Sequence, residues 1–328
     1  MNASRISQLF QNAKTKRIAV IGDVMIDRYI WGRVSRISPE APVPVVEVDN
    51  ETSRLGGAAN VANNVTSFGA KAFLIGVVGA DRSGDELRKI LIDEKNSPDG
   101  IVTDSSRPTT VKTRVIAHDQ HVVRIDSEEK RDVSPEIQDK IFSVLERNID
   151  SIDGIVIEDY NKGVVAKDLI AKIIGLAAKK HKIITVDPKF NNFFEYKNVT
   201  VFKPNKKETE EALGKKLRSE EDILAAGKML LEKLRAENIL MTRSEKGMSV
   251  FEKNGAVTTI PTIARHVADV SGAGDTVIAT LTLLLAAGAT MIEAALIANI
   301  AGGIVCGEVG IVPIDPEVLQ TQLLQHHG

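Results

Sequence analysis

The chain has 328 residues, of which 43% are hydrophobic and 26% are charged. This length and apolar content suffice for a sizeable core, and α/β proteins of this size often form one domain. Acidic and basic residues are mixed along the chain and leave a net charge of -2, so neither a nucleic-acid partner nor a membrane surface is indicated.

A single cysteine, Cys306, excludes a disulfide framework and fits a reducing compartment. We interpret it as a small core residue, with a functional thiol as the alternative. Residues 1–16 lack the apolar segment and cleavage site of a signal peptide, and the longest apolar run, residues 277–287, is too short to span a bilayer. We therefore expect a cytoplasmic protein.

The first apolar run, residues 17–22, predicts a buried strand that ends at Gly22. Asp23 follows directly, so its carboxylate should lie at the carboxyl end of the strand, where open α/β sheets bind ligands. Asp27 comes four residues later, one helical turn further on. Asp23 is a candidate ligand for a substrate, and a turn cap is the alternative.

Prolines exclude a helix in residues 34–48, and alternating residues there indicate an exposed or edge strand. The pair Gly56 and Gly57 then opens a predicted helix that runs to about residue 68. Two glycines let a backbone approach a ligand closely, and Asn60 can donate to or accept from a sugar hydroxyl. The alternative is that the glycines only allow close packing.

Residues 109–115 and 121–125 alternate β-branched and polar residues around a polar turn, which predicts a hairpin. Such an element can cover a site or pair with another subunit. Lys112, Arg114 and Arg124 lie on it. They are either solvated strand charges or a clamp on a substrate phosphate, a task for which the forked donors of arginine are suited.

From residue 133 onward, short apolar runs alternate with amphipathic segments. This alternation predicts an α/β fold with a mostly parallel sheet covered by helices on both faces. Polar residues follow several of the predicted strands, as a ligand cleft at the strand ends requires. They include Glu158, Asp187, Lys189 and Lys203.

Asn205 and Glu208 begin a predicted helix after Pro204 and can form a capping box. The alternative is that their oxygens hold Mg²⁺ through water, since Mg²⁺ takes few protein oxygens and keeps several waters.

Residues 240–247 form a strand and a polar turn that closes on Gly247. Its amides and side chains could donate to phosphate, or it could be an ordinary hairpin turn.

The last long apolar helix begins with a capping box formed by Thr290 and Glu293. Its length and apolar surface predict that it is buried. Asn299 lies inside it, and a buried amide needs partners. Either the core or a bound adenosine could supply them.

The segment Asp269-Val-Ser-Gly-Ala-Gly-Asp275 precedes an apolar helix that Gly288 ends. Its glycines leave backbone N–H groups free at the positive end of the helix dipole, where phosphate oxygens bind. Asp275 would repel a phosphate there unless it takes a proton from an attacking hydroxyl. The pattern thus indicates phosphoryl transfer to an alcohol, with a simple helix cap as the alternative.

Four motifs occur in one order: Gly22-Asp23, Gly56-Gly-Ala-Ala-Asn60, Asn205-x-x-Glu208, and the segment from Asp269 to Asp275. Together they resemble the ribokinase-like (PfkB) sugar kinases. The resemblance implies a ribokinase-like three-layer α/β sandwich that forms one domain over residues 1–328. It also implies a small β-strand lid from about residues 30–50 and 109–126, shared by two subunits of a homodimer.

The resemblance also implies roles for the candidate residues. Asp275 would be the catalytic base, and the amides of Gly272, Ala273 and Gly274 would form the anion hole. A sugar phosphate would lie on Asp23, Gly56, Gly57, Asn60, Lys112, Arg114, Arg124, Glu158, Asp187 and Lys189. ATP would lie on Asn205, Glu208, Thr242, Arg243, Ser244, Gly247, Gly272, Gly274 and Asn299, with Mg²⁺ at Asn205 and Glu208. Relatives are also activated by a monovalent cation, which these residues alone do not predict.

Longer segments, at residues 37–46, 56–62, 242–248 and 299–305, resemble the heptose-phosphate kinases of ADP-heptose and lipopolysaccharide synthesis. Those enzymes phosphorylate C1 of D-glycero-β-D-manno-heptose 7-phosphate, and many carry a cytidylyltransferase-like domain. No H-x-G-H motif occurs here, so we expect the kinase alone. A kinase of fructose, ribose or a hexose phosphate is the alternative. A non-catalytic sugar or nucleotide sensor would be expected to lack Asp275.

Overall fold

The computed structural model describes residues 1–117, 120–262 and 268–327. Within them, one sheet has the strand order β13-β12-β11-β10-β9-β8-β1-β4-β5. Neighbours from β11 to β5 are parallel, and β12 and β13 run antiparallel at one edge, which confirms the predicted mostly parallel sheet. The strands are β1 (Arg17–Gly22), β4 (Lys71–Val78), β5 (Ile101–Thr103), β8 (Gly154–Glu158), β9 (Ile183–Asp187), β10 (Val201–Phe202), β11 (Asn238–Thr242), β12 (Met248–Glu252) and β13 (Val257–Ile260).

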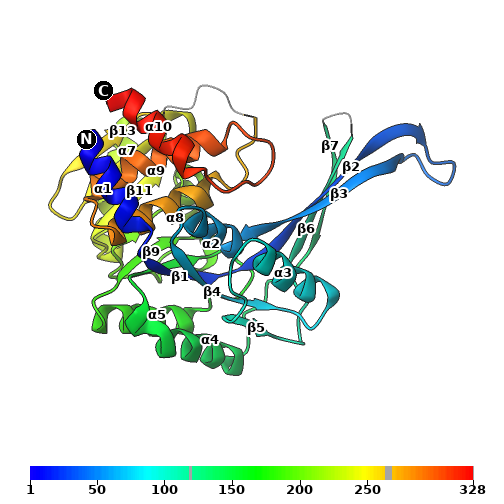
Figure 1. The fold of residues 1–328 in the computed structure, drawn as a ribbon, viewed down its shortest axis with the longest axis horizontal. Coiled ribbons are helices and arrows are strands. Elements are labelled where there is room, and N and C mark those ends of the chain that lie inside the picture. The colour runs from blue at the N-terminus through cyan, green and yellow to red at the C-terminus, as the bar shows by residue number, and fades with distance from the viewer. Residues whose placement is uncertain (118–119, 263–267, 328) are drawn as a thin grey trace.

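Helices cover both faces of this sheet (Figure 1). Alternate residues of β1 belong to different buried clusters: Ile18 and Val20 to one, and Ala19 and Ile21 to the other. One layer holds α1 (Ala3–Ala13), α2 (Ala58–Ser67), α3 (Arg82–Asp93), α8 (Ala273–Ala286), α9 (Met291–Val305) and α10 (Pro316–His327). The other holds α4 (Pro135–Asn148), α5 (Lys167–Lys179) and α7 (Glu220–Leu234), and α6 (Lys206–Leu213) follows β10.

The helices α8 and α9 pack against each other and are apolar on nearly all sides, as predicted. Gly288 has a left-handed backbone (φ 94°) just after α8. At the start of α9, Thr290 Oγ1 accepts the N–H of Glu293 at 3.2 Å, and Glu293 Oε2 accepts the N–H of Thr290 at 2.9 Å. The predicted capping box is therefore confirmed.

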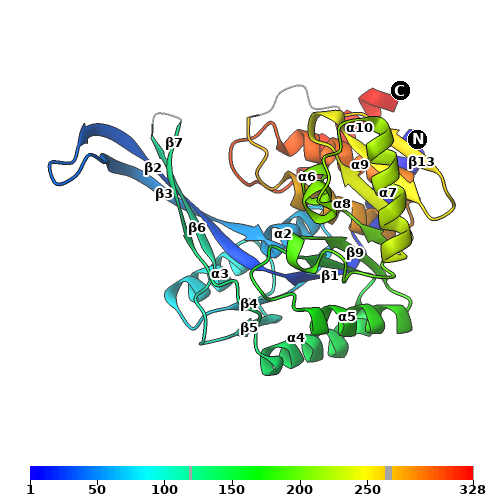
Figure 2. The ribbon, with the colours of Figure 1, turned by 180° about the vertical axis from the view of Figure 1, so that it is seen from behind.

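A second sheet projects from the body as an arm (Figure 1, Figure 2). Its order is β3-β2-β6-β7, with β2 (Val24–Ile37), β3 (Pro44–Gly57), β6 (Val111–Ala117) and β7 (Gln120–Ser127). We call these four strands the lid. The predicted hairpin of β6 and β7 is confirmed, and residues 118–119 between its strands lie outside the described residues.

The prediction that Asp27 lies one helical turn beyond Asp23 was wrong, because Asp27 is part of β2. Residues 24–31 are mostly β-branched, aromatic or long apolar residues that favour a strand. The predicted strand at residues 34–48 is the far end of a hairpin formed by β2 and β3. The predicted helix start at Gly56 is also later than expected, since β3 extends to Gly57.

The two terminal helices, α1 and α10, were not predicted. In α1 the buried residues Ile6, Leu9, Phe10 and Ala13 recur at helical spacing and pack on the same layer as α8. The spacing was a usable signal. No helix of the described residues combines the length and the apolar character needed to cross a membrane.

Candidate active site

The helix α8 begins at Gly272, whose backbone is left-handed (φ 78°). A Cβ at this position would lie 2.9 Å from Asn60 Nδ2, so both the backbone and the packing require glycine. The N–H of Ala273 donates to the Val270 carbonyl over a long 3.4 Å, and those of Gly272 and Gly274 have no acceptor among the described residues. The start of α8 can therefore bind an anion.

Asp275 lies in the first turn of α8 and is only 2% exposed. Its Oδ2 accepts a hydrogen bond from Asn60 Nδ2 at 2.7 Å, and its Oδ1 accepts one from the Tyr160 hydroxyl at 2.8 Å. Burial raises the pKa of Asp275 to about 6, although these two hydrogen bonds oppose the shift. A carboxylate with such a pKa is ionised at neutral pH and still able to take a proton.

A cluster of three buried carboxyl groups lies at the ends of β8 and β9 and the start of α8. Glu158, Asp187 and Asp275 each place one oxygen within 4.8 Å of the others. Both carboxyl oxygens of Glu158 lack a partner in the described part of the chain. Burial, and then the charges of Asp187 and Asp275, raise the pKa of Glu158 well above its ordinary value. This carboxyl group can meet a ligand's hydroxyls or a cation.

Lys203 follows β10 and forms a buried ion pair with Asp187 at 2.6 Å. Burial acts to lower the pKa of Lys203, but Asp187 and Glu158 outweigh it and raise the value. The ammonium group thus stays charged and offsets part of the negative charge of the cluster. Gly274 lies beside this pair, because a Cβ there would be 3.7 Å from Lys203 Nζ.

Asp23 lies at the end of β1, as predicted, and is 1% exposed. Its carboxylate accepts the backbone N–H groups of Tyr160 (2.7 Å), Lys162 (3.1 Å) and Val164 (3.1 Å). Burial raises its pKa to about 6, and these three hydrogen bonds oppose the rise. The carboxylate therefore fixes the loop after β8, while its role as a sugar ligand stays a prediction.

Gly56 and Gly57 lie where β3 joins α2. A Cβ on Gly56 would be 2.0 Å from Asp27 Oδ2, and one on Gly57 would be 2.4 Å from the Asp23 carbonyl. The backbone of Gly57 is also left-handed (φ 57°). Close packing therefore accounts for both glycines, and it brings them beside the buried Asp27. Their contact with a sugar stays a prediction.

The four predicted phosphate-binding cations have different surroundings. Arg114 forms an ion pair with Asp27. Arg124 pairs with Asp126 at 3.0 Å on an exposed part of the lid. Lys189 pairs with Glu208. Lys112 is half-buried, and its Nζ lies 5.1 Å from the centre of the Tyr160 ring; it forms no ion pair among the described residues, although the charges of Asp27 and Asp126 attract it.

Asn205 and Glu208 form the predicted capping box at the start of α6. Asn205 Oδ1 accepts the N–H of Glu208, and Glu208 Oε2 accepts the N–H of Asn205, both at 2.8 Å. Lys189 occupies the other oxygen of Glu208. An isolated parallel bridge joins Asn205 to Thr242, so two segments predicted to contact ATP lie side by side.

The turn after β11 is confirmed as a tight turn. The N–H of Arg243 donates to the Gly247 carbonyl at 2.7 Å, and Ser244 is exposed between them. The Arg243 side chain is buried, bonds Ser249 at 3.0 Å and pairs with Glu220. Its guanidinium is therefore engaged within the fold.

Asn299 Nδ2 donates to the Pro261 carbonyl at 2.8 Å, so the core supplies one partner of this buried amide.

Sequence reasoning did not predict Tyr160 at this site and did not give Asp27 a role in it. Asp27 was seen but placed on the wrong kind of element. Tyr160 follows Glu158 and Asp159 directly, and its position after a buried strand was the only signal. Nothing in the sequence reveals that its hydroxyl contacts Asp275, which lies 115 residues later.

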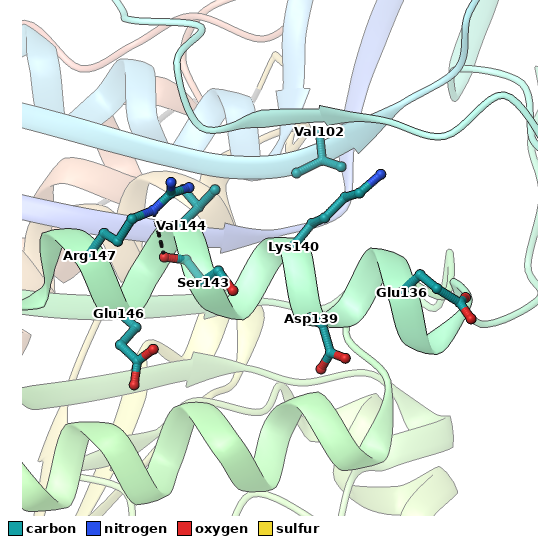
Figure 3. A pocket seen from close by; sticks show the side chains of 8 residues that line it. All are labelled: Val102, Glu136, Asp139, Lys140, Ser143, Val144, Glu146 and Arg147. Carbon is teal, nitrogen blue, oxygen red and sulfur yellow. Dashed lines mark hydrogen bonds between the residues drawn. The ribbon is translucent and has the colours of Figure 1, made fainter.

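A groove along α4 lies on the outer surface of the other helical layer (Figure 3). Charged side chains of α4 dominate its lining, and Arg147 Nε donates to the Ser143 carbonyl at 3.1 Å. None of the predicted site residues contributes to it. It is lined by Val102, Glu136, Asp139, Lys140, Ser143, Val144, Glu146 and Arg147.

Comparison with known proteins supports the chemistry that this geometry indicates. Residues 15–317 match the family described as pfkB family carbohydrate kinase. The bifunctional protein HldE of Geobacter sulfurreducens is 42% identical over 328 residues, which are 100% of this chain and 67% of that protein. HldE of Helicobacter pylori is 44% identical over 312 residues, or 95% of this chain and 67% of the relative. The chain thus spans about two thirds of the length of these relatives.

Solved structures support the fold. Phosphofructokinase-2 from Escherichia coli, in complex with potassium, superposes with a TM-score of 0.75 at 17% identity and covers 95% of this chain and 98% of its own. Arabidopsis thaliana ribokinase, complexed with ribose and ATP, gives a TM-score of 0.74 at 17% identity, over 95% and 99%. The predicted ribokinase-like architecture is therefore confirmed.

Proposed function

Because the chain belongs to the pfkB family of carbohydrate kinases, we propose that it phosphorylates the C1 hydroxyl of D-glycero-β-D-manno-heptose 7-phosphate with ATP. The observation that carries the proposal is the proximity of an ionisable carboxylate, Asp275, to the open amides at the start of α8. The likeness to HldE proteins favours a heptose phosphate over other sugars. The product, a 1,7-bisphosphate, would serve ADP-heptose and lipopolysaccharide inner-core synthesis.

In the proposed reaction the C1 oxygen attacks the γ-phosphorus of ATP. A C1–O–P bond forms while the bond from the γ-phosphorus to the oxygen that bridges the β-phosphate breaks, and ADP leaves with that oxygen. Asp275 accepts the proton of the C1 hydroxyl. The amides of Gly272, Ala273 and Gly274 stabilise the negative charge of the transferred group.

ATP enters this reaction as its magnesium complex. We propose that the nucleotide lies along Asn205, Thr242 to Gly247 and Asn299, and that Asn205 and Glu208 hold the ion through water. The hydrogen bonds of the capping box and the ion pair of Glu208 with Lys189 favour contact through water over direct ligation. The unpartnered carboxyl of Glu158 and that of Asp187 add acidic groups close to the same end of α8.

The phosphate of the sugar needs a cationic side chain that is not already held in an ion pair. Of the four predicted candidates, Lys112 is the one that forms no ion pair among the described residues, and it is half-buried at the base of the lid. Burial lowers its pKa, and a bound phosphate would reverse that shift. We therefore rank Lys112 above Arg114, Arg124 and Lys189 as the phosphate ligand. Asp23, Gly56, Gly57 and Asn60, together with Asp27, would lie against the sugar.

The experiment that tests this function measures ADP release with a panel of sugars and sugar phosphates. We expect kcat/KM for the heptose 7-phosphate to exceed that for heptose, fructose and ribose by at least about a hundredfold. A sugar without a phosphate would leave the phosphate-binding cation unpaired in the site. Preference for fructose 6-phosphate would keep the kinase assignment and reject the substrate. If no compound on the panel causes ADP release, the protein would be a non-catalytic sensor, which is the alternative that the intact Asp275 argues against.

We also propose that the lid joins two subunits of a homodimer. The supporting observation is apolar surface on the lid, where Val48, Val123 and Ile125 are 59%, 47% and 56% exposed.

A monovalent cation is proposed on the likeness to the potassium complex of phosphofructokinase-2. Potassium chloride should then raise kcat relative to a tetramethylammonium salt of equal ionic strength.

A further inference from the structure

Tyr160 contacts three separate parts of the fold. Its N–H donates to Asp23 Oδ2 at 2.7 Å, so its backbone is fixed to the end of β1. The ammonium groups of Lys112 and Lys189 lie 5.1 Å and 5.2 Å from the centre of its ring. One lysine belongs to the lid and the other to the loop after β9, so the ring has cationic neighbours from two separate parts of the fold.

The Tyr160 hydroxyl is directed at the carboxylate that the proposed reaction uses as its base. It donates to Asp275 Oδ1 at 2.8 Å, while Asn60 Nδ2 donates to Oδ2 at 2.7 Å. Two donors from different elements fix the rotation of the carboxylate about its last side-chain bond. Each oxygen keeps a second lone pair, and one of these can accept the substrate proton.

We propose that Tyr160 is a positioning residue, which orients Asp275 toward the acceptor hydroxyl without itself taking part in proton or phosphoryl transfer. The proposal rests on the proposed function, because it needs Asp275 as the base. It also links the lid to the base, since Lys112 contacts the ring whose hydroxyl holds Asp275. A base that is free to rotate would spend less time in line with the C1 oxygen, so kcat should fall while nucleotide binding stays.

The test compares Tyr160→Phe with a matched control, Tyr196→Phe. Tyr196 is also buried and also donates its hydroxyl to a carboxylate, that of Asp159 at 2.6 Å, but it makes no hydrogen bond to Asp275. We expect Tyr160→Phe to lower kcat by at least about tenfold with KM for ATP within about twofold. We expect Tyr196→Phe to keep kcat near the wild-type value. Equal losses of kcat in the two variants would mean that the Tyr160 hydroxyl has only a structural role and would overturn the proposal.

A second measurement places Tyr160→Phe in the Asp275→Asn background. If Tyr160 acts through the base, the added substitution leaves the residual kcat unchanged there. The same factor lost in both backgrounds would mean a general loss of active enzyme and would contradict the proposal. The proposed function fails separately, through an Asp275→Asn variant that keeps normal turnover.

Discussion

At the scale of single residues, Asp275 is the proposed catalytic base. Replacement by asparagine keeps the shape of the side chain and the contacts with Asn60 and Tyr160, since an amide can accept from one and donate to the other. We expect Asp275→Asn to fold, to bind ATP, and to lose at least about a hundredfold in kcat, the lower range for a general base. ADP release at saturating substrates measures kcat, and nucleotide titration by calorimetry is the control. Turnover close to the wild-type rate would remove Asp275 from the mechanism.

If Asp275 is the base, its pKa gives the proposed reaction a pH dependence. Burial raises this pKa to about 6, and a base works only in its ionised form, so activity is retained above this value and lost as the pH falls through it. We expect kcat/KM to decrease about tenfold per pH unit below pH 6. The residual activity of Asp275→Asn should lack this acid limb. Its persistence in that variant would assign the limb to another group, such as Glu158 or the phosphates of the substrates.

Residue identities at this site could be predicted wherever a local pattern carried them. Asp275 and the glycines before it form a contiguous segment, and Asn205 and Glu208 have the spacing of a helix cap. Tyr160 could not be predicted because its significance arises from a contact across 115 residues. The ion pairs that engage Arg114 and Arg243 likewise depend on tertiary packing, which the sequence does not state.

At the scale of helices and strands, two glycines in the middle of helices make a test of packing. A Cβ on Gly227 of α7 would lie 2.3 Å from ring atoms of the buried Phe251, whereas one on Gly175 of α5 would meet nothing within 4 Å. We expect Gly227→Ala to lower the free energy of unfolding by about 1–3 kcal/mol through overpacking. Gly175→Ala should instead raise it by about 0.5–1 kcal/mol, because alanine favours a helix.

Thermal or urea denaturation of the two variants measures this difference. Opposite signs are the expected outcome, and a stabilised Gly227→Ala would mean that Phe251 has room to move. Neither substitution lies in the candidate active site, so kcat at a temperature well below the transition should match the wild type for Gly175→Ala.

Element types were predictable where periodicity was strong, as in the buried strands and in α8 and α9. The prediction of element type was wrong where the chain passes from one sheet to the other, from β1 through Asp23 into β2. Gly22 marks the end of β1, but nothing in the local sequence shows that the chain enters a second sheet two residues later, because the direction of β2 is set by its partners β3 and β6.

At the scale of the whole molecule, the lid sets the proposed assembly. Val123 and Ile125 are two residues apart on β7, so they share one face of the strand, and both are largely exposed. We expect the wild type to have twice the monomer mass in light scattering, and Val123→Asp/Ile125→Asp to have the monomer mass at the same concentration. A wild type that is monomeric at micromolar concentration would contradict the shared lid.

The architecture as a whole followed from alternation of strands and helices together with four motifs, and the mostly parallel sheet was confirmed. The size and direction of the lid were only partly predicted, because its long strands are stabilised by one another and project away from the core (Figure 2). The identity of the sugar depends on contacts that local motifs do not contain.

The central claim is that the amides at the start of α8 and the carboxylate of Asp275 act on one phosphoryl transfer. A crystal structure with a non-hydrolysable ATP analogue, magnesium and the heptose 7-phosphate tests it most directly. We predict that the γ-phosphate lies within hydrogen-bond distance of the amides of Gly272 to Gly274, with the C1 hydroxyl between it and Asp275. A γ-phosphate bound away from α8, or a C1 hydroxyl out of reach of Asp275, would contradict the account.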